Sequence, residues 1–388
     1  MTEKTEAPSA KDHHDQNLIA RPGSRLEITT PALVLDLDAL DANIAAMAAK
    51  AAAQGIGLRP HAKTHKSAAI GRRQMDSGAL GLCCAKLSEA EALAAGGLDR
   101  FLLTSPVTGS RRIERLIALK QRCRDLMLVV DDAENLRQLS AAAKAQGVSL
   151  DLLIDVDVGQ RRTGVASTEQ ALALAGIIAA EERLNFHGLQ GYAGHLQHIT
   201  DYGERRQASH AALGQLAAVR DALEAAGHPC PIMTGGGTGS HAFDHEAGVL
   251  NELQVGSYTV CDVEYDAVDL AGDGASPFRA GLFVYSRVIS ANHPGFVTID
   301  AGSKSIATDG PAPEVVSGAP KGSRYSVSGD EFGQLDLPGE AEILKVGDLV
   351  ILQVPHCDPT INLFDHYHCV RGDALVALWP IEARGASF

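Results

Sequence analysis

Short apolar runs alternate with longer alanine- and leucine-rich segments over residues 38–275. The apolar runs are "GLRPH" (57–61), "GLCCA" (81–85), "RFLLT" (100–104), "LMLVV" (126–130), "LDLLIDVD" (150–157), "NFHGLQGY" (185–192), "PIMT" (231–234) and "ELQVG" (252–256). Most of the segments between them have the length and composition of helices. Eight short strands that alternate with helices predict an α/β fold of the (β/α)8 TIM-barrel type. A doubly wound sheet gives a similar alternation, and the count of eight favours the barrel.

From about residue 277 the pattern changes to strand-like runs separated by turn residues, with little helical periodicity. These runs are "GLFVYSRVIS", "GFVTIDAG", "RYSVSG", "LVILQVP" and "HYHCVRGDALVALW". They predict a C-terminal, mostly antiparallel β-domain. We expect the N-terminal run at residues 32–37 to supply its first strand. The predicted organisation is therefore a disordered tail at 1–22, a barrel at 38–275, and a β-domain built from 23–37 and 276–388.

Composition narrows the class of protein. The chain has 388 residues, of which 45% are hydrophobic, so it is long enough to bury a large core. Its formal net charge of −14 argues against a nucleic-acid or anionic-membrane partner. The first 18 residues contain no apolar segment of the kind found in secretory signals, and the seven cysteines show no regular spacing. We expect a soluble cytoplasmic protein that binds neither nucleic acid nor a membrane.

The segment "LRPHAKTHK" (58–66) gathers basic side chains at the end of the first predicted barrel strand. Active sites of such barrels lie at the carboxyl ends of the strands. A lysine held there among histidines and an arginine can have a lowered pKa and act as a Schiff-base nucleophile. A solvated basic loop explains this segment alone equally well.

Two glycine turns follow the last two barrel strands. They are "TGGGTGS" (234–240) and "GSY" (256–258). Successive glycines expose backbone N–H groups and let a phosphate approach the chain, and Thr238 and Ser240 add hydroxyls. The loops after strands seven and eight are a frequent phosphate site in this fold. A flexible linker is the alternative for either turn, but the pair predicts a phosphorylated ligand.

Two other loops bring polar side chains to the same rim. "DVDVGQRRTGV" places Arg162 where it can meet an anionic or aromatic ligand, and "GYAGHLQH" brings Tyr192, His195 and His198. An exposed arginine or a solvated histidine is the alternative for each of these residues.

The segment "PHCDPT" (355–360) predicts a metal site in the β-domain. If the strand continues through it, His356 and Asp358 point to one side and Cys357 to the other. An imidazole and a carboxylate suit Mn²⁺, Mg²⁺ or Zn²⁺ and leave positions open for substrate. A hydrogen-bonded His/Asp turn is the alternative.

Together these motifs resemble the fold-type III pyridoxal-phosphate enzymes, and within them the D-threonine aldolase / D-serine dehydratase-like family. The resemblance runs in order through "TPALVLDLDAL", "RPHAKTHK", "GLCCAKLSEAEA", "VDVGQRRTGV", "LQGYAGHLQH", "TGGGTGS", "NELQVGSY", "DAGSK" and "HCDPTINLFD". It covers nearly the whole chain. Two departures stand out: Phe332 replaces a histidine that is frequent in the family, and the segments "CCAK" and "SPV" differ from the usual ones.

The resemblance implies a role for each site residue. Lys63 would carry pyridoxal 5'-phosphate, with Arg162 and Tyr192 at its ring. The phosphate would be bound by Gly236, Gly237, Thr238, Gly256, Ser257 and Tyr258. His356 and Asp358 would hold a divalent metal, with Mn²⁺ or Mg²⁺ favoured and Zn²⁺ or Co²⁺ as the alternatives, and His198 would be the candidate base. The dehydratases of the family place a cysteine where this chain has Asp358, which is the aldolase-like pattern.

The expected function is therefore a metal-activated lyase that cleaves D-β-hydroxy amino acids to glycine and an aldehyde. The alternatives are a D-serine or D-3-hydroxyaspartate dehydratase on the same scaffold, a racemase, and a non-catalytic pyridoxal-phosphate carrier. A metal-dependent barrel hydrolase would leave the lysine motif without a role. The resemblance also implies a homodimer.

Overall fold

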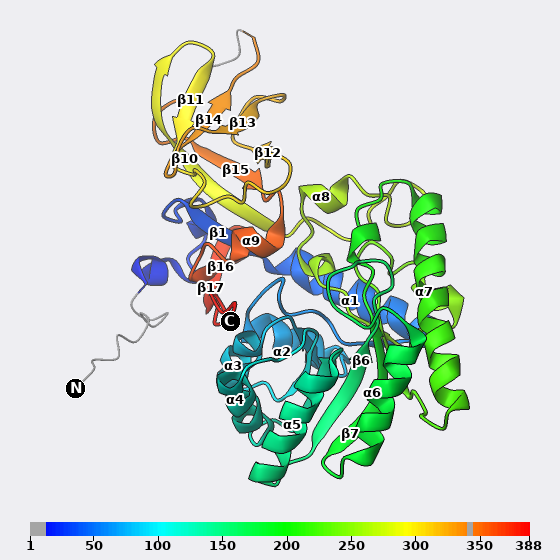
Figure 1. The fold of residues 1–388 in the computed structure, drawn as a ribbon. Helices are drawn as coiled ribbons and strands as arrows, with labels where there is room; N and C mark the ends of the chain where they lie inside the picture. Colours follow the sequence, from blue (N-terminus) through cyan, green and yellow to red (C-terminus); the bar gives the residue numbers. More distant parts are fainter. Residues whose placement is uncertain (1–12, 340–343) are drawn as a thin grey trace, which may run out of the picture. The chain divides into compact units, whose positions relative to one another are not determined.

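The computed structural model describes residues 13–339 and 344–388, which form two compact units (Figure 1). The β unit comprises the described residues up to Asn43 together with Thr259–Ala267 and Phe278–Arg384. The barrel unit comprises Ile44–Tyr258, Val268–Pro277 and Gly385–Phe388.

The barrel unit is built on a sheet of eight parallel strands. They are β2 (Gly57–Leu58), β3 (Leu82–Cys84), β4 (Arg100–Leu103), β5 (Asp125–Val130), β6 (Leu150–Asp155), β7 (Leu184–Gly191), β8 (Ile232–Gly235) and β9 (Glu252–Leu253). The strands at the two ends of the sheet, β2 and β3, meet through a parallel bridge between His61 and Cys83. This bridge closes the sheet into a barrel. Each strand overlaps one of the eight apolar runs, so the predicted barrel is confirmed.

Helices follow the first six barrel strands and cover the outside of the sheet (Figure 1). They are α2 (Ala68–Asp76), α3 (Leu87–Ala95), α4 (Ser110–Lys120), α5 (Ala133–Gln146), α6 (Thr168–Ala180) and α7 (Tyr202–Ala225); α1 (Leu37–Gln54) precedes the barrel strands. Three of them begin at an N-cap whose side chain accepts a backbone N–H: Asp132, Ser167 and Asp201. After β8 and β9 the chain forms the short 3-10 helices η5 (Asp244–Ala247) and η6 (Ser257–Thr259).

The barrel strands are apolar almost throughout because parallel strands are covered on both faces. Strand β5, for example, is buried at every position after Asp125. Side chains of four adjacent strands form one core cluster, consisting of Cys83, Leu102, Met127, Val129 and Leu153. This rigid framework holds the loops at the carboxyl ends of the strands.

The β unit contains a nine-stranded sheet in which β1 (Ala32–Asp36) lies between β10 (Leu282–His293) and β16 (His366–Arg371). The other strands are β11 (Phe296–Ile299), β12 (Glu314–Ser317), β13 (Arg324–Val327), β14 (Gly333–Asp336), β15 (Leu349–Gln353) and β17 (Ala374–Pro380). Among the strand pairs of this sheet in the described residues, β1–β16 alone is parallel. The predicted antiparallel domain with an N-terminal strand is therefore confirmed. Strands β12 and β14 lie outside the strand-like runs that the sequence predicted.

The N-terminal segment differs from the expectation of a disordered tail at 1–22. Residues His14–Leu18 form a 3-10 helix, η2, and Ser24–Leu26 form a second one, η3. Leu18 is buried in a core cluster with Ile28, Ala32 and Val34, and this burial orders the segment. Residues 1–12 of the predicted tail lie outside the described residues.

The unit boundaries also differ from the predicted ones at 37 and 276. Residues 38–43 and 259–267 group with the β unit. The side-chain amide of Asn43 donates to the carbonyl oxygens of Thr259 (3.1 Å) and Arg279 (2.8 Å), which ties these three segments together. A short helix, α8 (Val263–Asp266), follows within the same unit.

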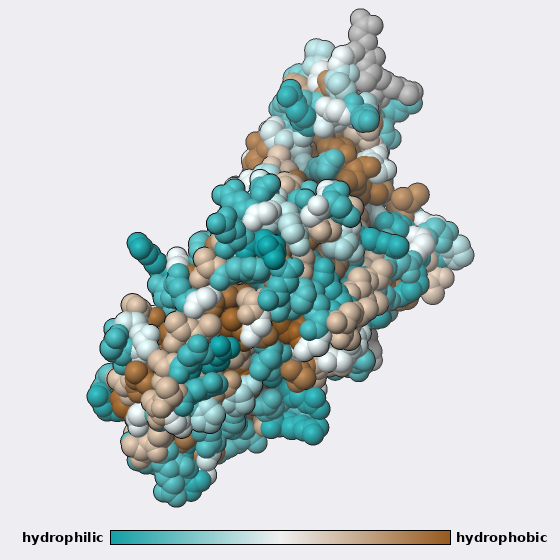
Figure 2. Space-filling model, turned by 90° about the vertical axis from the view of Figure 1, so that its right-hand side faces the viewer, coloured by the Kyte–Doolittle hydropathy of each residue, from teal (hydrophilic) through white to brown (hydrophobic). Residues whose placement is uncertain are grey.

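The surface is mixed in character. On the face shown in Figure 2, hydrophilic residues predominate and hydrophobic ones are scattered among them. Within the described ranges, none of the helices is both long and apolar enough to cross a membrane.

Candidate active site

A cavity of about 370 Å³ opens at the carboxyl ends of the barrel strands. It is lined by His61, Lys63, Ala85, Lys86, Thr104, Ser105, Arg162, Thr163, Gln190, Tyr192 and Gln254. These residues end or follow strands β2, β3, β4, β6, β7 and β9. The cavity lies where a TIM barrel places its chemistry, and its volume falls in the range of small-molecule sites.

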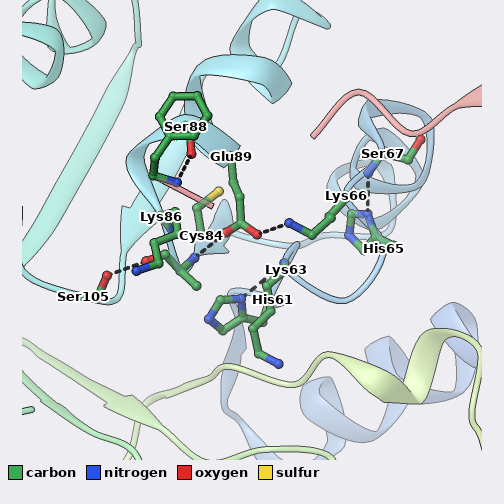
Figure 3. A network of polar contacts seen from close by, with 12 residues as sticks. His61, Lys63, His65, Lys66, Ser67, Cys84, Lys86, Ser88, Glu89 and Ser105 are labelled. Atoms are coloured by element: carbon green, nitrogen blue, oxygen red, sulfur yellow. Dashed lines mark hydrogen bonds and ion pairs between the residues drawn. The ribbon is translucent and has the colours of Figure 1, made fainter. Parts of the chain in front are cut away.

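The basic side chains of segment 58–66 have separate surroundings. The guanidinium of Arg59 is buried in the barrel and makes a bidentate ion pair with Glu252 on β9, with N–O distances of 2.8 and 3.0 Å. Lys66 is buried and forms an ion pair of 2.8 Å with Glu89 (Figure 3). Lys63 is half-buried and lines the cavity. Of these three cations, therefore, only Lys63 lines the cavity.

Glu89 holds Lys66 in place and also shapes the cavity wall. Its second carboxylate oxygen accepts the backbone N–H groups of Ala85 (2.8 Å) and Lys86 (3.1 Å), at the start of α3. Figure 3 shows this carboxylate between Lys66 and the chain around Cys84. A buried carboxylate with three partners is satisfied, which explains why Lys66 is fixed away from the cavity.

The two histidines of the segment have separate partners. His61 lines the cavity, and its Nε2 lies 3.1 Å from the hydroxyl of Thr104. His65 is fully buried, with Nε2 3.1 Å from Gln74 Oε1. The amide of Gln74 donates to the hydroxyl of Tyr258 at 3.1 Å. His65 therefore supports the second glycine turn rather than the cavity.

Arg162 and Tyr192 come together as the sequence predicted. Both line the cavity, and the guanidinium carbon of Arg162 lies 5.6 Å from the centre of the Tyr192 ring. A cation at this distance from an aromatic face is attracted by the ring quadrupole. The pair presents a positive charge and an aromatic ring on the cavity wall.

A buried polar network beneath the cavity escaped the sequence analysis. Gln254 Nε2 donates to Gln190 Oε1 (3.0 Å), and Gln190 Nε2 donates to Asp155 Oδ1 (2.9 Å). Thr163 donates to the other oxygen of Asp155 (2.7 Å). Burial raises the pKa of Asp155 to about 6 against the effect of these hydrogen bonds. The signal in the sequence was a polar residue at the end of each strand, "DVD", "LQG" and "LQV", inside otherwise apolar runs.

The two glycine turns lie against each other. The backbone N–H of Tyr258 donates to the hydroxyl of Thr238 at 3.1 Å, and both residues are buried. A Cβ on Gly256 would lie 2.6 Å from Thr64 Oγ1. That hydroxyl is buried and has no hydrogen-bond partner among the described residues. An unsatisfied hydroxyl beside a glycine turn fits a bound anion, because a buried polar group normally has a partner.

Packing also explains the glycines of segment 234–240. A Cβ on Gly237 would lie 2.5 Å from Gln197 Oε1, and one on Gly239 would overlap with the backbone oxygen of Gln197. Gly236 has a φ of +67°, in the region that favours glycine. These glycines are required by the neighbouring chain as well as by any ligand.

A carboxylate lies beneath the first turn. Asp244 accepts the hydroxyls of Ser209 and Ser240, each at 2.6 Å. Burial raises the pKa of Asp244 to about 7. Ser240 also accepts from Gly237 N (3.2 Å) and Gln197 Nε2 (3.1 Å). The turn is therefore held from below by a buried network.

The histidines of the loop after β7 lie apart from the cavity lining. Gln160 Oε1 accepts the backbone N–H of His195 at 2.6 Å. His195 and His198 are both exposed, and neither is among the residues that line the cavity. Between them Gln197 is buried, and its Oε1 accepts the N–H of Gly239 at 2.8 Å. The loop that carries His198 is thus joined to the first glycine turn.

The predicted metal ligands lie in the β unit, and the strand geometry assumed for them is wrong. Strand β15 ends at Gln353, His356 is an N-cap, and Cys357–Ile361 form a short helix, α9. Cys357 is buried, and its thiol lies 3.5 Å from Asp358 Oδ1 rather than on an opposite face. The proline at 359 suits the first turn of a helix, which explains the change.

A further acidic residue, Asp309, contacts the predicted ligand His356. His356 Nδ1 lies 2.9 Å from Asp309 Oδ2, a contact that the sequence analysis missed because the two residues are 47 positions apart. A histidine that binds a metal usually donates its other ring N–H to a carboxylate. With Nδ1 bound to Asp309, Nε2 of His356 is the nitrogen suited to a metal ion. His356 and Asp358 therefore offer donor atoms of the kinds that divalent ions bind.

Comparison with known proteins agrees with the family that the sequence motifs resemble. The family described as alanine racemase, N-terminal domain, matches residues 35–262, and a serine dehydratase domain matches residues 281–370. The chain is 37% identical to a 3-hydroxy-D-aspartate aldolase of Paracoccus denitrificans (strain Pd 1222) and 39% identical to a D-threonine aldolase of Arthrobacter sp; each comparison covers 95% of this chain and 96% of the relative. The crystal structure of a D-threonine aldolase from Filomicrobium marinum superposes with a TM-score of 0.90, at 38% identity, over 94% of this chain and 98% of that one.

Proposed function

The chain belongs to the D-threonine aldolase and D-serine dehydratase family of alanine-racemase-like enzymes, and we propose that it is a pyridoxal-phosphate-dependent lyase that cleaves D-β-hydroxy amino acids to glycine and an aldehyde. One observation carries this proposal. Lys63 of the family motif lines a cavity at the carboxyl ends of the barrel strands, whereas Lys66 is held in a buried ion pair.

The residues of the barrel unit fit the cofactor. Lys63 would hold it covalently, and Arg162 and Tyr192 would contact its ring region. The phosphate would take backbone N–H groups and hydroxyls of the two glycine turns, from Gly236, Gly237, Thr238, Gly256, Ser257 and Tyr258. The buried, unpartnered hydroxyl of Thr64 beside Gly256 supports a phosphate there. When bound, pyridoxal phosphate supplies an electron sink for the bond that breaks at Cα.

The protein must then orient the substrate and move two protons. One proton leaves the β-hydroxyl as the Cα–Cβ bond breaks, and another is added at Cα before glycine leaves. We propose His198 as the base that takes the first proton, on the strength of the family resemblance. The buried amides of Gln190 and Gln254 hold the polar floor of the cavity in a fixed geometry, and a fixed set of dipoles costs no reorganisation during the reaction.

His356 and Asp358 would hold a divalent ion, with Mn²⁺ or Mg²⁺ favoured over Zn²⁺ and Co²⁺ because a carboxylate ligand prefers hard cations. Such an ion would supply Lewis acidity toward a hydroxyl oxygen. The support for it in this chain is the orientation of His356 by Asp309 at 2.9 Å.

Product analysis tests the function. Purified protein with pyridoxal phosphate is incubated with D- and L-threonine, D-serine and D- and L-3-hydroxyaspartate, with and without a chelator. We expect glycine and an aldehyde from the D-substrates only, and no turnover with the chelator. Release of a 2-oxo acid and ammonia would instead establish a dehydratase, and interconversion of enantiomers would establish a racemase.

We further propose that the protein is a homodimer in the cytoplasm, as the family resemblance implies. Sedimentation of the purified chain across a range of concentrations measures its oligomeric state. A monomer at every concentration tested would contradict the proposal.

A further inference from the structure

A cluster of histidines in the β unit has no part in the proposed reaction. It begins with His13, His14 and Asp15, whose ligand atoms all lie within 4.8 Å of one another. Strand β16 adds His366 and His368, whose ring centres lie 5.3 and 5.0 Å from that of His13. Five side chains of metal-ligating types, from two distant parts of the sequence, therefore meet beside the 3-10 helix η2.

His368 supplies an independent reason to expect a cation in this cluster. It is buried, with 6% of its surface exposed. Its Nδ1 lies 3.3 Å from the carbonyl oxygen of Leu33, and because a carbonyl only accepts, Nδ1 must carry the hydrogen. In the neutral ring, Nε2 then presents its lone pair to Asp15 Oδ2, which lies 3.2 Å away. Nε2 makes no hydrogen bond of accepted geometry with the described residues.

Two acceptors that face each other at this distance need a proton or a metal ion between or beside them. The arrangement of His368 is the one seen in metal sites, where a ligating histidine donates its other N–H to a backbone carbonyl. Asp15 is fixed in the same way, because it accepts the backbone N–H of Thr29 at 3.1 Å and its hydroxyl at 2.8 Å. Both side chains are therefore oriented in advance.

The remaining imidazoles make a metal ion the better candidate. Imidazole nitrogens are ligands that transition metals prefer, and those of His13 and His14 lie with the Asp15 carboxylate within 4.8 Å of one another. The backbone N–H of Asp15 donates to Nδ1 of His13 at 3.2 Å, a bond that a metal ion on that nitrogen would replace. His14 is largely exposed and able to turn toward an incoming ion.

We propose that His13, His14, Asp15 and His368 form a binding site for a divalent transition-metal ion, with Zn²⁺ as the ion that suits these ligands best. Three imidazoles and one carboxylate match the nitrogen-rich coordination of Zn²⁺, whereas Mg²⁺ and Ca²⁺ prefer oxygen ligands. The site is separate from His356 and Asp358. A bound ion would cross-link the N-terminal segment, through His13, His14 and Asp15, to His368 on strand β16.

Calorimetric titration of the full-length, cofactor-loaded protein with ZnCl₂, after removal of metals, tests the proposal. The variant His13→Ala/His14→Ala should lose one equivalent of Zn²⁺ or bind it at least about 10-fold more weakly. The matched control His228→Ala/His293→Ala removes two histidines elsewhere and should bind Zn²⁺ like the wild type. The variant His356→Ala should keep this equivalent, which separates the two metal sites.

Hydrogen exchange gives a second readout that does not depend on stoichiometry. Zn²⁺ should slow amide exchange in residues 13–18 of the wild type and of the control variant, but not of His13→Ala/His14→Ala. If that variant binds Zn²⁺ with wild-type stoichiometry and affinity, the proposed metal site does not exist. Circular dichroism verifies that each variant is folded.

Discussion

The ammonium of Lys66 lies 2.8 Å from a carboxylate oxygen of Glu89, and both side chains are buried. Lys63, three residues earlier, lines the cavity at the ends of the barrel strands. Two lysines of one short motif thus have different surroundings: the first lines the cavity and the second forms a buried ion pair.

This difference predicts opposite effects of two substitutions. Lys63→Ala should abolish the cofactor adduct that borohydride fixes to the protein, with little change in stability because Lys63 is only half-buried. Lys66→Met should leave Glu89 as a buried charge without its partner and lower the free energy of unfolding by about 3–5 kcal/mol. Peptide mass mapping after reduction and urea unfolding measure the two effects. Lys86→Ala is the control, because Lys86 also lines the cavity. An adduct on Lys66 or Lys86 would refute the assignment of Lys63.

The contacts of Gln197 predict which of two glycine substitutions a second mutation, Gln197→Ala, can rescue. Gly237→Ala meets the end of the Gln197 side chain, whereas Gly239→Ala meets its backbone oxygen. Each should destabilise the turn by about 1–3 kcal/mol and weaken cofactor binding. Adding Gln197→Ala should relieve the first clash but not the second. A double-mutant cycle on cofactor affinity and unfolding measures this. Equal behaviour of the two pairs would show that Gln197 does not set the shape of the turn.

Stability should fall with rising pH because of buried acids at the site. Burial raises the pKa of Asp244 to about 7 and of Asp155 to about 6, above the unfolded value near 4. Between these values the folded protein keeps protons that the unfolded chain has released, so the free energy of unfolding decreases as pH rises. Asp244→Asn should flatten this decrease, most clearly between about pH 6 and 7, where Asp155 contributes little. Urea unfolding from pH 4.5 to 7.5 measures it, and an unchanged slope in the variant would contradict the assignment.

Metal removal should separate turnover from cofactor binding. A chelator should abolish turnover and leave the visible absorbance of the cofactor nearly intact, because its proposed ligands lie in the barrel unit and the metal ligands lie in the β unit. Mn²⁺ or Mg²⁺ should restore activity. Loss of cofactor absorbance together with the metal would show that the two sites are not independent.

The contact between Asp309 and His356 predicts a graded series in the metal site. Asp309→Asn should weaken metal binding about 10- to 100-fold, since it removes the charge that orients the histidine, and His356→Ala should weaken it further. Cys357→Ser is the control, because a hydroxyl can still donate to Asp358 from the start of α9. Metal titration followed by activity ranks the variants. Stronger loss with Cys357→Ser than with Asp309→Asn would point to thiolate ligation.

The sequence by itself determined the barrel and the position of its active face. All eight barrel strands lie in runs of apolar residues, because strands of a closed parallel sheet are buried on both faces and must be apolar along their length. The order of strands and loops then fixed which motifs share the active face. Lys63, Arg162 and Tyr192 could be assigned to one rim for this reason, and the cavity unites them.

Only the tertiary structure decided what each polar side chain contacts. The partners of Lys66, Gln197 and His356 are Glu89, Gly239 and Asp309, which lie 23, 42 and 47 positions away along the chain. No local period or propensity encodes such contacts, since they depend on how separate loops meet after folding. The same holds for the histidine cluster, whose five side chains include His13 and His368. The N-terminal segment meets β16 there because β1 pairs with β16 and Leu18 is buried in the core beside it.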